Sequence, residues 1–99
     1  MKYKVEYLPQ TVTDRAEIRK YLSQFYPGTS KSFFALLRKK ISRLRTFPYS
    51  CPVYEEDSDY RKLVVGDYLV FYTVDDDKKI VEIHSIFHGS RSISQHLYE

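Results

Sequence analysis

The sequence has 99 residues, of which 42% are hydrophobic and 29% charged, which is enough for one core and too short for a second domain; we expect one domain over 1–99. Its single cysteine, Cys51, excludes an internal disulfide and favours a reducing compartment. No run of about 18 uncharged apolar residues occurs, so a cytoplasmic protein with no membrane partner is expected. The net charge of +3 is too small by itself to indicate a nucleic-acid partner.

The first part of the chain predicts a strand followed by a helix. Residues 2–8 alternate between polar and apolar types, as in a half-buried strand, and the predicted inner face carries Tyr3, Val5 and Tyr7. Pro9 ends this strand. Residues 11–26 then repeat apolar side chains at helical spacing, and the stripe predicted to face the core consists of Ile18, Leu22 and Phe25.

A second helix is predicted after the break that Pro27 and Gly28 introduce. Thr29 or Ser30 is suited to cap its amino terminus, because a hydroxyl oxygen can accept a backbone N–H of the first turn. Its predicted buried stripe consists of Phe33 or Phe34, Leu37, Ile41 and Leu44. Two helices joined by so short a break should pack antiparallel.

The carboxyl-terminal half predicts a meander of three strands. Gly66 and Asp67 separate strands at 61–65 and 68–74, and they suit a type II′ hairpin turn because glycine accepts a positive φ. A loop of three aspartates and two lysines leads to a third strand at 80–87. The order β-α-α-β-β-β predicts an α+β fold, in which a helical hairpin packs on a mostly antiparallel, twisted four-stranded sheet and leaves one flank open.

Strand alternation predicts which residues of the last strand face the core. The inner set is Val81, Ile83, Ser85 and Phe87, and the outer set is Glu82, His84 and His88. Four residues of a strand span roughly 13 Å, which is too far for His84 and His88 to hold one metal ion. We therefore expect no metal and no cofactor. Either histidine could act as an acid or base near neutral pH, or could simply be solvated.

Charge is segregated along the chain. Between Ser30 and Phe47 there are six basic residues and no acidic one, which gives a local charge of +6: Lys31, Arg38, Lys39, Lys40, Arg43 and Arg45. Acidic residues cluster instead at 55–59 and 75–77. Surface helices commonly carry such charge, so the basic stretch is either a solvated face or a docking surface for a polyanion or an acidic protein segment.

The sequence carries no motif of a common enzyme class. It has no nucleophile elbow, no phosphate-binding glycine loop and no dinucleotide fingerprint. The carboxyl-terminal half does contain a set of basic and aromatic residues: Tyr60, Arg61, Lys62, Tyr68, Tyr72, His88 and Arg91. Such groups serve RNA binding and cleavage, because cations hold phosphate and rings stack on bases. They suit a peptide carboxylate equally well, and tyrosines are also ordinary sheet residues.

The element order and three segments, at 60–63, 66–72 and 83–91, together resemble the RelE/ParE superfamily of type II toxin-antitoxin toxins. The most specific of them is the last, where the final strand runs into a His-Gly-Ser-Arg sequence. The resemblance spans nearly the whole chain. It implies a small toxin of a plasmid stabilisation module, which a cognate antitoxin neutralises by wrapping it with an extended or helical segment.

The superfamily has two modes of action. RelE-like members cut messenger RNA in the ribosomal A site with basic and aromatic residues, whereas ParE-like members lack that set and poison DNA gyrase. In the ribonuclease branch an arginine typically follows the tyrosine that opens the third strand, but here Leu69 follows Tyr68. Tyr98 also lies one residue further from Arg91 than the tyrosine that commonly completes the ribonuclease site. The resemblance therefore favours a gyrase inhibitor, with a ribosome-dependent mRNA endoribonuclease as the alternative and a non-toxic interaction domain as the third reading.

The residues that would carry these functions differ. The candidate catalytic residues of a ribonuclease are Arg61, Lys62, His88 and Arg91. His88 or Lys62 would deprotonate the 2′-hydroxyl and an arginine would stabilise the pentacovalent phosphate, without a metal. The residues predicted to bind the target (gyrase, or the ribosome with its mRNA) or the antitoxin are Arg38, Lys39, Arg43, Arg45, Tyr68 and Tyr72.

Overall fold

The computed structural model describes residues 2–25 and 28–90, so the predictions that concern Tyr26, Pro27, Arg91 and Tyr98 lie outside the described residues. Its elements are β1 (Lys4–Tyr7), α1 (Pro9–Leu22), α2 (Thr29–Arg43), β2 (Arg61–Val65), β3 (Tyr68–Asp75) and β4 (Ile80–His88). The strands form one sheet in the order β1-β4-β3-β2, in which β1 is parallel to β4 and the other neighbours are antiparallel. The predicted α+β fold and element order are confirmed.

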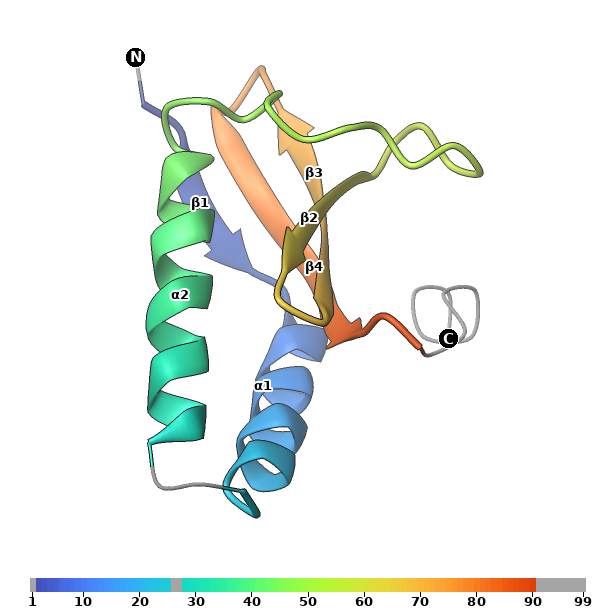
Figure 1. The fold of residues 1–99 in the computed structure, drawn as a ribbon. Coiled ribbons are helices and arrows are strands. Elements are labelled where there is room, and N and C mark those ends of the chain that lie inside the picture. The colour runs from blue at the N-terminus through green and yellow to red at the C-terminus, as the bar shows by residue number, and fades with distance from the viewer. Residues whose placement is uncertain (1, 26–27, 91–99) are drawn as a thin grey trace.

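Both helices cover the same face of the sheet and run antiparallel to each other (Figure 1). Helix α2 buries Leu37 and Ile41, and Leu44 is buried directly after it, which confirms the predicted stripe. Burying each of these aliphatic side chains contributes about 1.5–3 kcal/mol. Across from them, the sheet supplies the other half of the core: Val65, Tyr68, Val70, Tyr72, Val81, Ile83 and Ile86.

The helix ends differ from those predicted. Helix α1 begins at Pro9, because the fixed φ of proline suits a first helical residue, and it ends at Leu22. Phe25 therefore lies beyond the helix and is 53% exposed, so its predicted place in the buried stripe is wrong. Helix α2 follows Gly28, whose φ of +87° turns the chain, and no side chain caps it; the predicted hydroxyl cap is also wrong.

The buried side of α1 contains polar residues that hydrophobic spacing did not reveal. Thr11 and Asp14 are buried beside Ile18. The Oδ2 atom of Asp14 accepts the backbone N–H of Ile86 at 2.9 Å, and its Oδ1 accepts the Gln10 side-chain amide at 3.0 Å. Strand β1 pairs with β4 only as far as Ile83, so Asp14 satisfies a backbone donor on the β4 edge that β1 does not reach.

The tight turn between β2 and β3 forms as predicted. Gly66 has a φ of +58°, and its partner Asp67 has no positive φ, as a type II′ turn requires. Strand β2 is one of the two edges of the sheet, and Val53 adds an isolated bridge to its first residue, Arg61.

A β-bulge in β4 changes which residues face the helices. Phe71 of β3 pairs with Ser85, whereas the next residue, Tyr72, pairs with Ile83, so His84 is an extra residue in β4. Val81 and Ile83 face the helices as predicted, but beyond the bulge Ile86 takes that face. The prediction that Ser85 and Phe87 share the inner face is therefore wrong, as is the prediction that His84 and His88 share the outer one.

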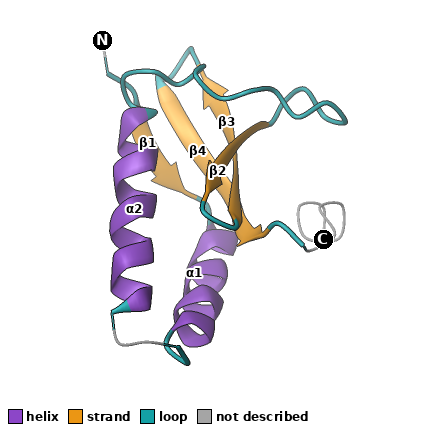
Figure 2. Cartoon of the chain, in the orientation of Figure 1, coloured by secondary structure: helices purple, strands orange, loops and turns teal. Residues whose placement is uncertain are grey.

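The sheet face opposite the helices has its own aromatic layer. Phe71 and Phe87 are buried there and stack with their ring centroids 5.4 Å apart. Tyr54 and Tyr60 approach Phe71 edge-on, and Tyr60 also contacts the ring of His84. Both tyrosines belong to the long loop that leaves α2 and returns as β2 (Figure 2). This loop, residues 44–60, is called the connector below, and it partly covers the flank that was expected to stay open.

Candidate functional site

Arg61, the first candidate catalytic residue, forms hydrogen bonds to the backbone of the connector. It opens β2 opposite Tyr72, so it points toward the helix-covered face. Its Nη1 donates to the carbonyl oxygens of Cys51, at 2.7 Å, and Tyr49, at 3.4 Å. The guanidinium lies 4.9 Å from the centroid of the Tyr49 ring. These contacts fix the loop after Pro48 against the sheet edge.

The other described candidates, Lys62 and His88, do not share a site with the Arg61 side chain. Lys62 pairs with Phe71 and so lies on the opposite face of the sheet. His88 pairs with Tyr68 at the other end of β3. Four residues along β3 and two strand spacings separate Arg61 from His88, which gives about 16 Å between their Cα atoms. Arg91 lies outside the described residues.

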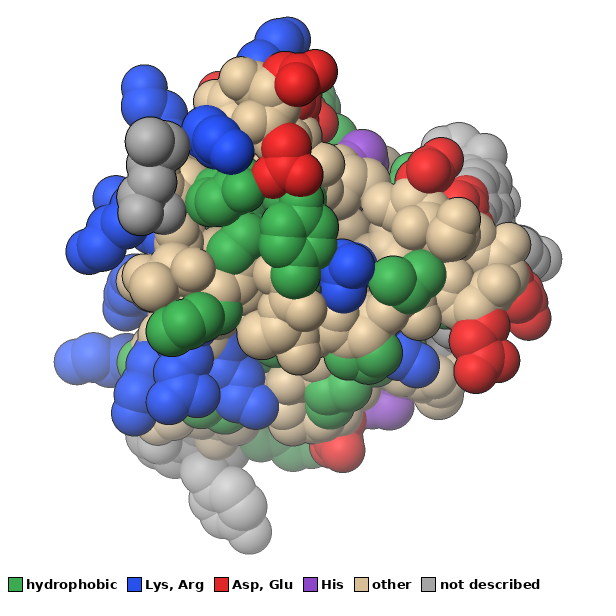
Figure 3. Space-filling model, turned by 90° about the horizontal axis from the view of Figure 1, so that it is seen from above, with side chains coloured by type: hydrophobic (Ala, Val, Ile, Leu, Met, Phe, Trp, Pro, Cys, Tyr) green, Lys and Arg blue, Asp and Glu red, His purple; other side chains and the backbone are tan. Residues whose placement is uncertain are grey.

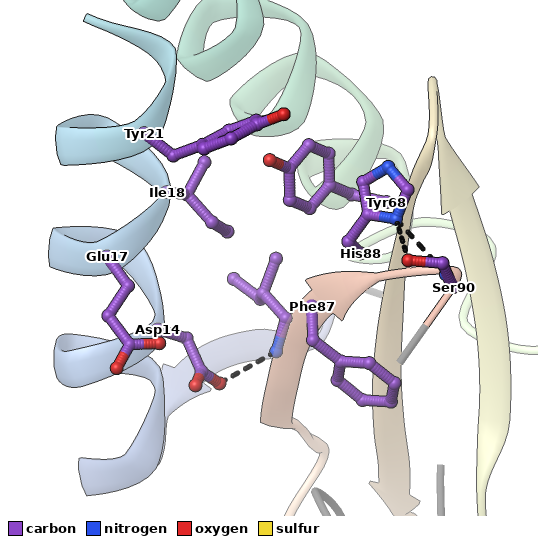
Figure 4. Close-up of a pocket in the computed structure, with 9 residues that line it drawn as sticks. Asp14, Glu17, Ile18, Tyr21, Tyr68, Phe87, His88 and Ser90 are labelled. Carbon is purple, nitrogen blue, oxygen red and sulfur yellow. Dashed lines mark hydrogen bonds between the residues drawn. The ribbon is translucent and has the colours of Figure 1, made fainter. Parts of the chain in front are cut away.

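His88 lies at the rim of a cavity beside α1 (Figure 4). Its ring meets that of Tyr68 edge-on, with centroids 5.3 Å apart. The backbone N–H of Ser90 donates to Nδ1 at 3.1 Å, and the Ser90 hydroxyl lies 2.8 Å from the same atom. Because Nδ1 is an acceptor, the neutral ring carries its proton on Nε2. His88 thus presents an N–H donor and is half-buried.

Tyr68 and Tyr72, which were predicted to bind a partner, belong to the core. Tyr68 is 7% exposed and packs against the Phe33 ring of α2 at 4.8 Å. Tyr72 is fully buried, and its hydroxyl donates to the carbonyl oxygen of Pro48 at 2.8 Å. Burial is the main cause that raises the pKa of Tyr72. Tyr72 therefore has no accessible surface for a ligand in this structure.

The basic residues predicted to bind a partner are exposed on α2 and directly after it. Arg38, Lys39, Arg43 and Arg45 all reach solvent, whereas Lys40 is half-buried and donates from Nζ to the carbonyl oxygen of Val64 at 3.1 Å. Arg43 and Lys40 lie in the last turn, where cations also interact favourably with the helix dipole. Figure 3, seen from the end where α2 finishes, shows most Lys and Arg side chains on the side of this helix.

A carboxylate that sequence reasoning did not single out joins three parts of the chain. Asp76, in the turn before β4, accepts the hydroxyl of Tyr3 at 2.5 Å through Oδ1 and the hydroxyl of Tyr49 through Oδ2. The hydrogen bond to Asp76 raises the pKa of Tyr49 to about 12. The two tyrosines lower the pKa of Asp76 in return. Only the acidic cluster at 75–77 hinted at this residue in the sequence.

Two classes of site receive no support from the part of the chain that is described. Residues 2–25 and 28–90 contain no group of three or more His, Cys, Asp or Glu side chains that could hold a metal ion. Neither described helix has the length and apolar character needed to cross a bilayer.

Comparison with known families gives the strongest single indication of what the chain is. A model of the ParE toxin of type II toxin-antitoxin systems, the toxin of parDE, matches residues 5–93. The chain belongs to this ParE toxin family. The resemblance to the RelE/ParE superfamily is thereby confirmed, and this ParE-family chain is the toxin component of a type II toxin-antitoxin system.

Solved structures share the fold of this ParE-family chain. The toxin-antitoxin complex RelBE2 from Mycobacterium tuberculosis matches with a TM-score of 0.64 and 19% identity, over 89% of this chain and 99% of that one. A substituted E. coli toxin RelE in the free state matches with a TM-score of 0.65 and 19% identity, over 98% and 94%. The archaeal RelE-RelB complex from Pyrococcus horikoshii matches with a TM-score of 0.51 and 21% identity, over 93% and 100%. No curated protein matches the sequence.

Proposed function

We propose that this ParE-family toxin inhibits DNA gyrase by binding it and catalyses no reaction. The observation that carries the proposal is the separation of Arg61, Lys62 and His88, of which Arg61 is engaged with the connector and Lys62 lies on the other face. Cleavage of RNA through its 2′-hydroxyl needs a base and a cation within hydrogen-bond reach of the same phosphodiester. Groups about 16 Å apart do not meet that requirement.

We also propose that a cognate antitoxin neutralises the toxin and docks on the basic face formed by Arg38, Lys39, Arg43 and Arg45. Two of the structural neighbours are toxin-antitoxin complexes, which supports such a partner. The four side chains are exposed and positively charged, so they would attract an acidic segment over a distance set by the salt concentration. We further propose that residues 1–99 form one domain that acts in the cytoplasm, where it would meet both gyrase and the antitoxin.

The test expresses the toxin without its antitoxin and follows both targets in parallel. Messenger RNA is mapped for new ends on ribosomes, and plasmid supercoiling by purified gyrase is measured with added toxin. We expect growth arrest with intact messages, a loss of supercoiling and trapped gyrase complexes. Ribosome-dependent cuts with unaffected gyrase would contradict the proposal and support the RelE-like mRNA endoribonuclease instead.

A further inference from the structure

Three arginines lie along the seam between α1 and α2. Arg15 and Arg19 are one turn apart on α1, and the Arg19 guanidinium lies 4.7 Å from the centroid of the Phe34 ring on α2. Because the two helices run antiparallel (Figure 1), one turn back along α1 lies opposite one turn forward along α2. Arg15 is therefore level with Arg38.

The end of β1 reaches the same place. Tyr7, the last residue of β1, is 39% exposed, and the Arg15 guanidinium lies 4.5 Å from the centroid of its ring. Burial raises the pKa of Tyr7, whereas the positive charges of Arg15 and Arg38 lower it, so both charges act on the same phenol. A hydroxyl and two guanidinium groups, from three different elements, are thus available to donate to one anion.

Neither helix places a carboxylate in this seam. The only acidic residues of α1 and α2 are Asp14 and Glu17, and both line the cavity beside β4 (Figure 4). Lys31 adds an exposed cation on α2, seven residues before Arg38 and therefore on the same side of the helix. The helices therefore concentrate positive charge at the seam, although the net charge of the whole chain is only +3.

The chemistry of the seam suits the backbone of a nucleic-acid duplex. A peptide helix binds by burying apolar side chains in a groove, and a single strand of nucleic acid stacks its bases on exposed rings. Here the guanidinium groups of Arg15 and Arg19 lie over the rings of Tyr7 and Phe34, so the seam presents cations in place of apolar surface. Guanidinium groups bind phosphate oxygens through paired N–H donors, and a duplex offers such phosphates at regular spacing.

We propose that the helix seam, defined as Tyr7, Arg15, Arg19, Lys31 and Arg38, binds the phosphodiester backbone of duplex DNA. The choice of DNA rests on the proposed function, because gyrase acts on DNA and a toxin held there would meet its target more often. Contacts to phosphate carry no sequence information, so the seam would accept any DNA sequence. The seam shares Arg38 with the basic face proposed for the antitoxin, so the antitoxin and DNA would compete for the toxin.

Fluorescence anisotropy of a labelled DNA duplex, titrated with full-length toxin, tests the seam directly. Its four cations should neutralise about four phosphates, so a logarithmic plot of the association constant against salt concentration should have a slope of about −3.6. Binding should therefore weaken roughly 100-fold between about 50 mM and about 200 mM salt. An affinity that does not depend on salt would overturn the proposal.

Two double substitutions with the same change in net charge locate the contact. Arg19→Gln with Arg38→Gln removes two exposed cations of the seam, so the salt slope should fall by about two and binding should weaken at least about tenfold. Arg19→Lys with Arg38→Lys should keep the slope, because the charges remain. The control, Lys4→Gln with Lys78→Gln, removes exposed cations of β1 and of the turn before β4 and should weaken binding less than about twofold. Equal losses in the two glutamine variants would overturn the proposal.

Competitors identify the class of ligand. Polyglutamate should displace the labelled DNA at least about tenfold less effectively, per charge, than unlabelled duplex DNA, because the duplex has the higher charge density and releases more counterions. Displacement by polyglutamate as effective as by DNA would overturn the proposal and assign the seam to an acidic protein segment. An RNA duplex of the same length should compete no better than DNA, and stronger competition by RNA would overturn the choice of DNA.

The seam and the gyrase proposal can fail separately. If the toxin binds duplex DNA through the seam but leaves purified gyrase active, the gyrase proposal fails and the seam stands. If the toxin inhibits gyrase but does not bind duplex DNA at low salt, the seam is overturned and the gyrase proposal stands.

Discussion

The two helices lie on the same face of the sheet but contribute to the molecule in different ways. Helix α2 buries an apolar stripe, which includes Leu37 and Ile41, and turns most of its cations to solvent. Helix α1 buries the carboxylate of Asp14 against β4, where it accepts the backbone N–H of Ile86. Helix α2 is joined to the sheet by apolar burial and by an exposed hydrogen bond from Lys40 to Val64, whereas α1 is fixed by a buried hydrogen bond from Ile86 to Asp14. One helix thus exposes a basic face, whereas the other is anchored to the sheet by a buried carboxylate.

The largest expected effect is the loss of stability when a buried aliphatic side chain of α2 is shortened. Ile41→Ala removes a side chain that is 2% exposed and leaves a cavity between α2 and the sheet. We expect the free energy of unfolding to fall by about 2–5 kcal/mol, measured by urea denaturation. Lys39→Ala, on the exposed side of the same helix, is the control and should change it by less than about 0.5 kcal/mol. Equal effects of the two substitutions would contradict the assigned orientation of α2.

Asp14→Ala tests the buried hydrogen bond between α1 and β4. It leaves the N–H of Ile86 without its acceptor, so we expect a loss of about 1–3 kcal/mol in the free energy of unfolding. Amide hydrogen exchange should show the Ile86 N–H exchanging faster at the same time. Asp14→Asn retains an acceptor oxygen and should lose less. If Asp14→Ala were as stable as wild type, with Ile86 still protected, α1 would be held by apolar contacts alone.

The double substitution Arg38→Glu with Arg43→Glu examines the exposed face of α2. Both residues are exposed, so stability should fall by no more than about 1 kcal/mol, the cost of an anion in place of Arg43 at the helix end. The antitoxin should associate at least about tenfold more slowly because the attracting charge is reversed. Stopped-flow mixing at low and high salt measures this rate, and the difference from wild type should shrink as salt is added. A rate equal to that of wild type at low salt would remove the basic face of α2 from the antitoxin interface.

The smallest expected effect is the pH dependence of stability that His84 of β4 contributes. Burial lowers the pKa of His84, whose Nε2 lies 2.9 Å from the Thr73 hydroxyl. A histidine whose folded pKa lies below its unfolded pKa binds protons more readily when unfolded, so it destabilises the fold as pH falls below about 6.5. We expect wild-type toxin to lose more unfolding free energy than His84→Gln between about pH 7.5 and about pH 5. Parallel losses in both proteins would assign the pH dependence to other groups.

The sequence alone was sufficient wherever local periodicity or turn chemistry decides the structure. The stripe through Leu37 and Ile41 and the turn at Gly66 are of this kind, because each depends on neighbours a few residues away. The exposed position of Arg38 followed from the same helical periodicity. These elements determined most of the fold.

The remainder depends on contacts between distant parts of the chain. The extra residue at His84 has no local signal, and it reverses the faces of every later residue in β4. Asp14 is buried where β1 ends before Ile86, so its position depends on how β1 and β4 pair. Arg61 looked like a free cation, but the connector that follows α2 returns its carbonyl oxygens to that guanidinium.

The most direct test of the central claim, that this ParE-family toxin acts on gyrase without catalysis, uses Lys62→Met. Lys62 lies on the face opposite His88, and its removal leaves the helix-side core unchanged. Supercoiling by purified gyrase is measured with increasing wild-type toxin and with increasing Lys62→Met, alongside cleavage of ribosome-bound mRNA. We expect both proteins to inhibit gyrase equally and to leave the mRNA intact. Active gyrase, together with mRNA cleavage that Lys62→Met abolishes, would contradict it.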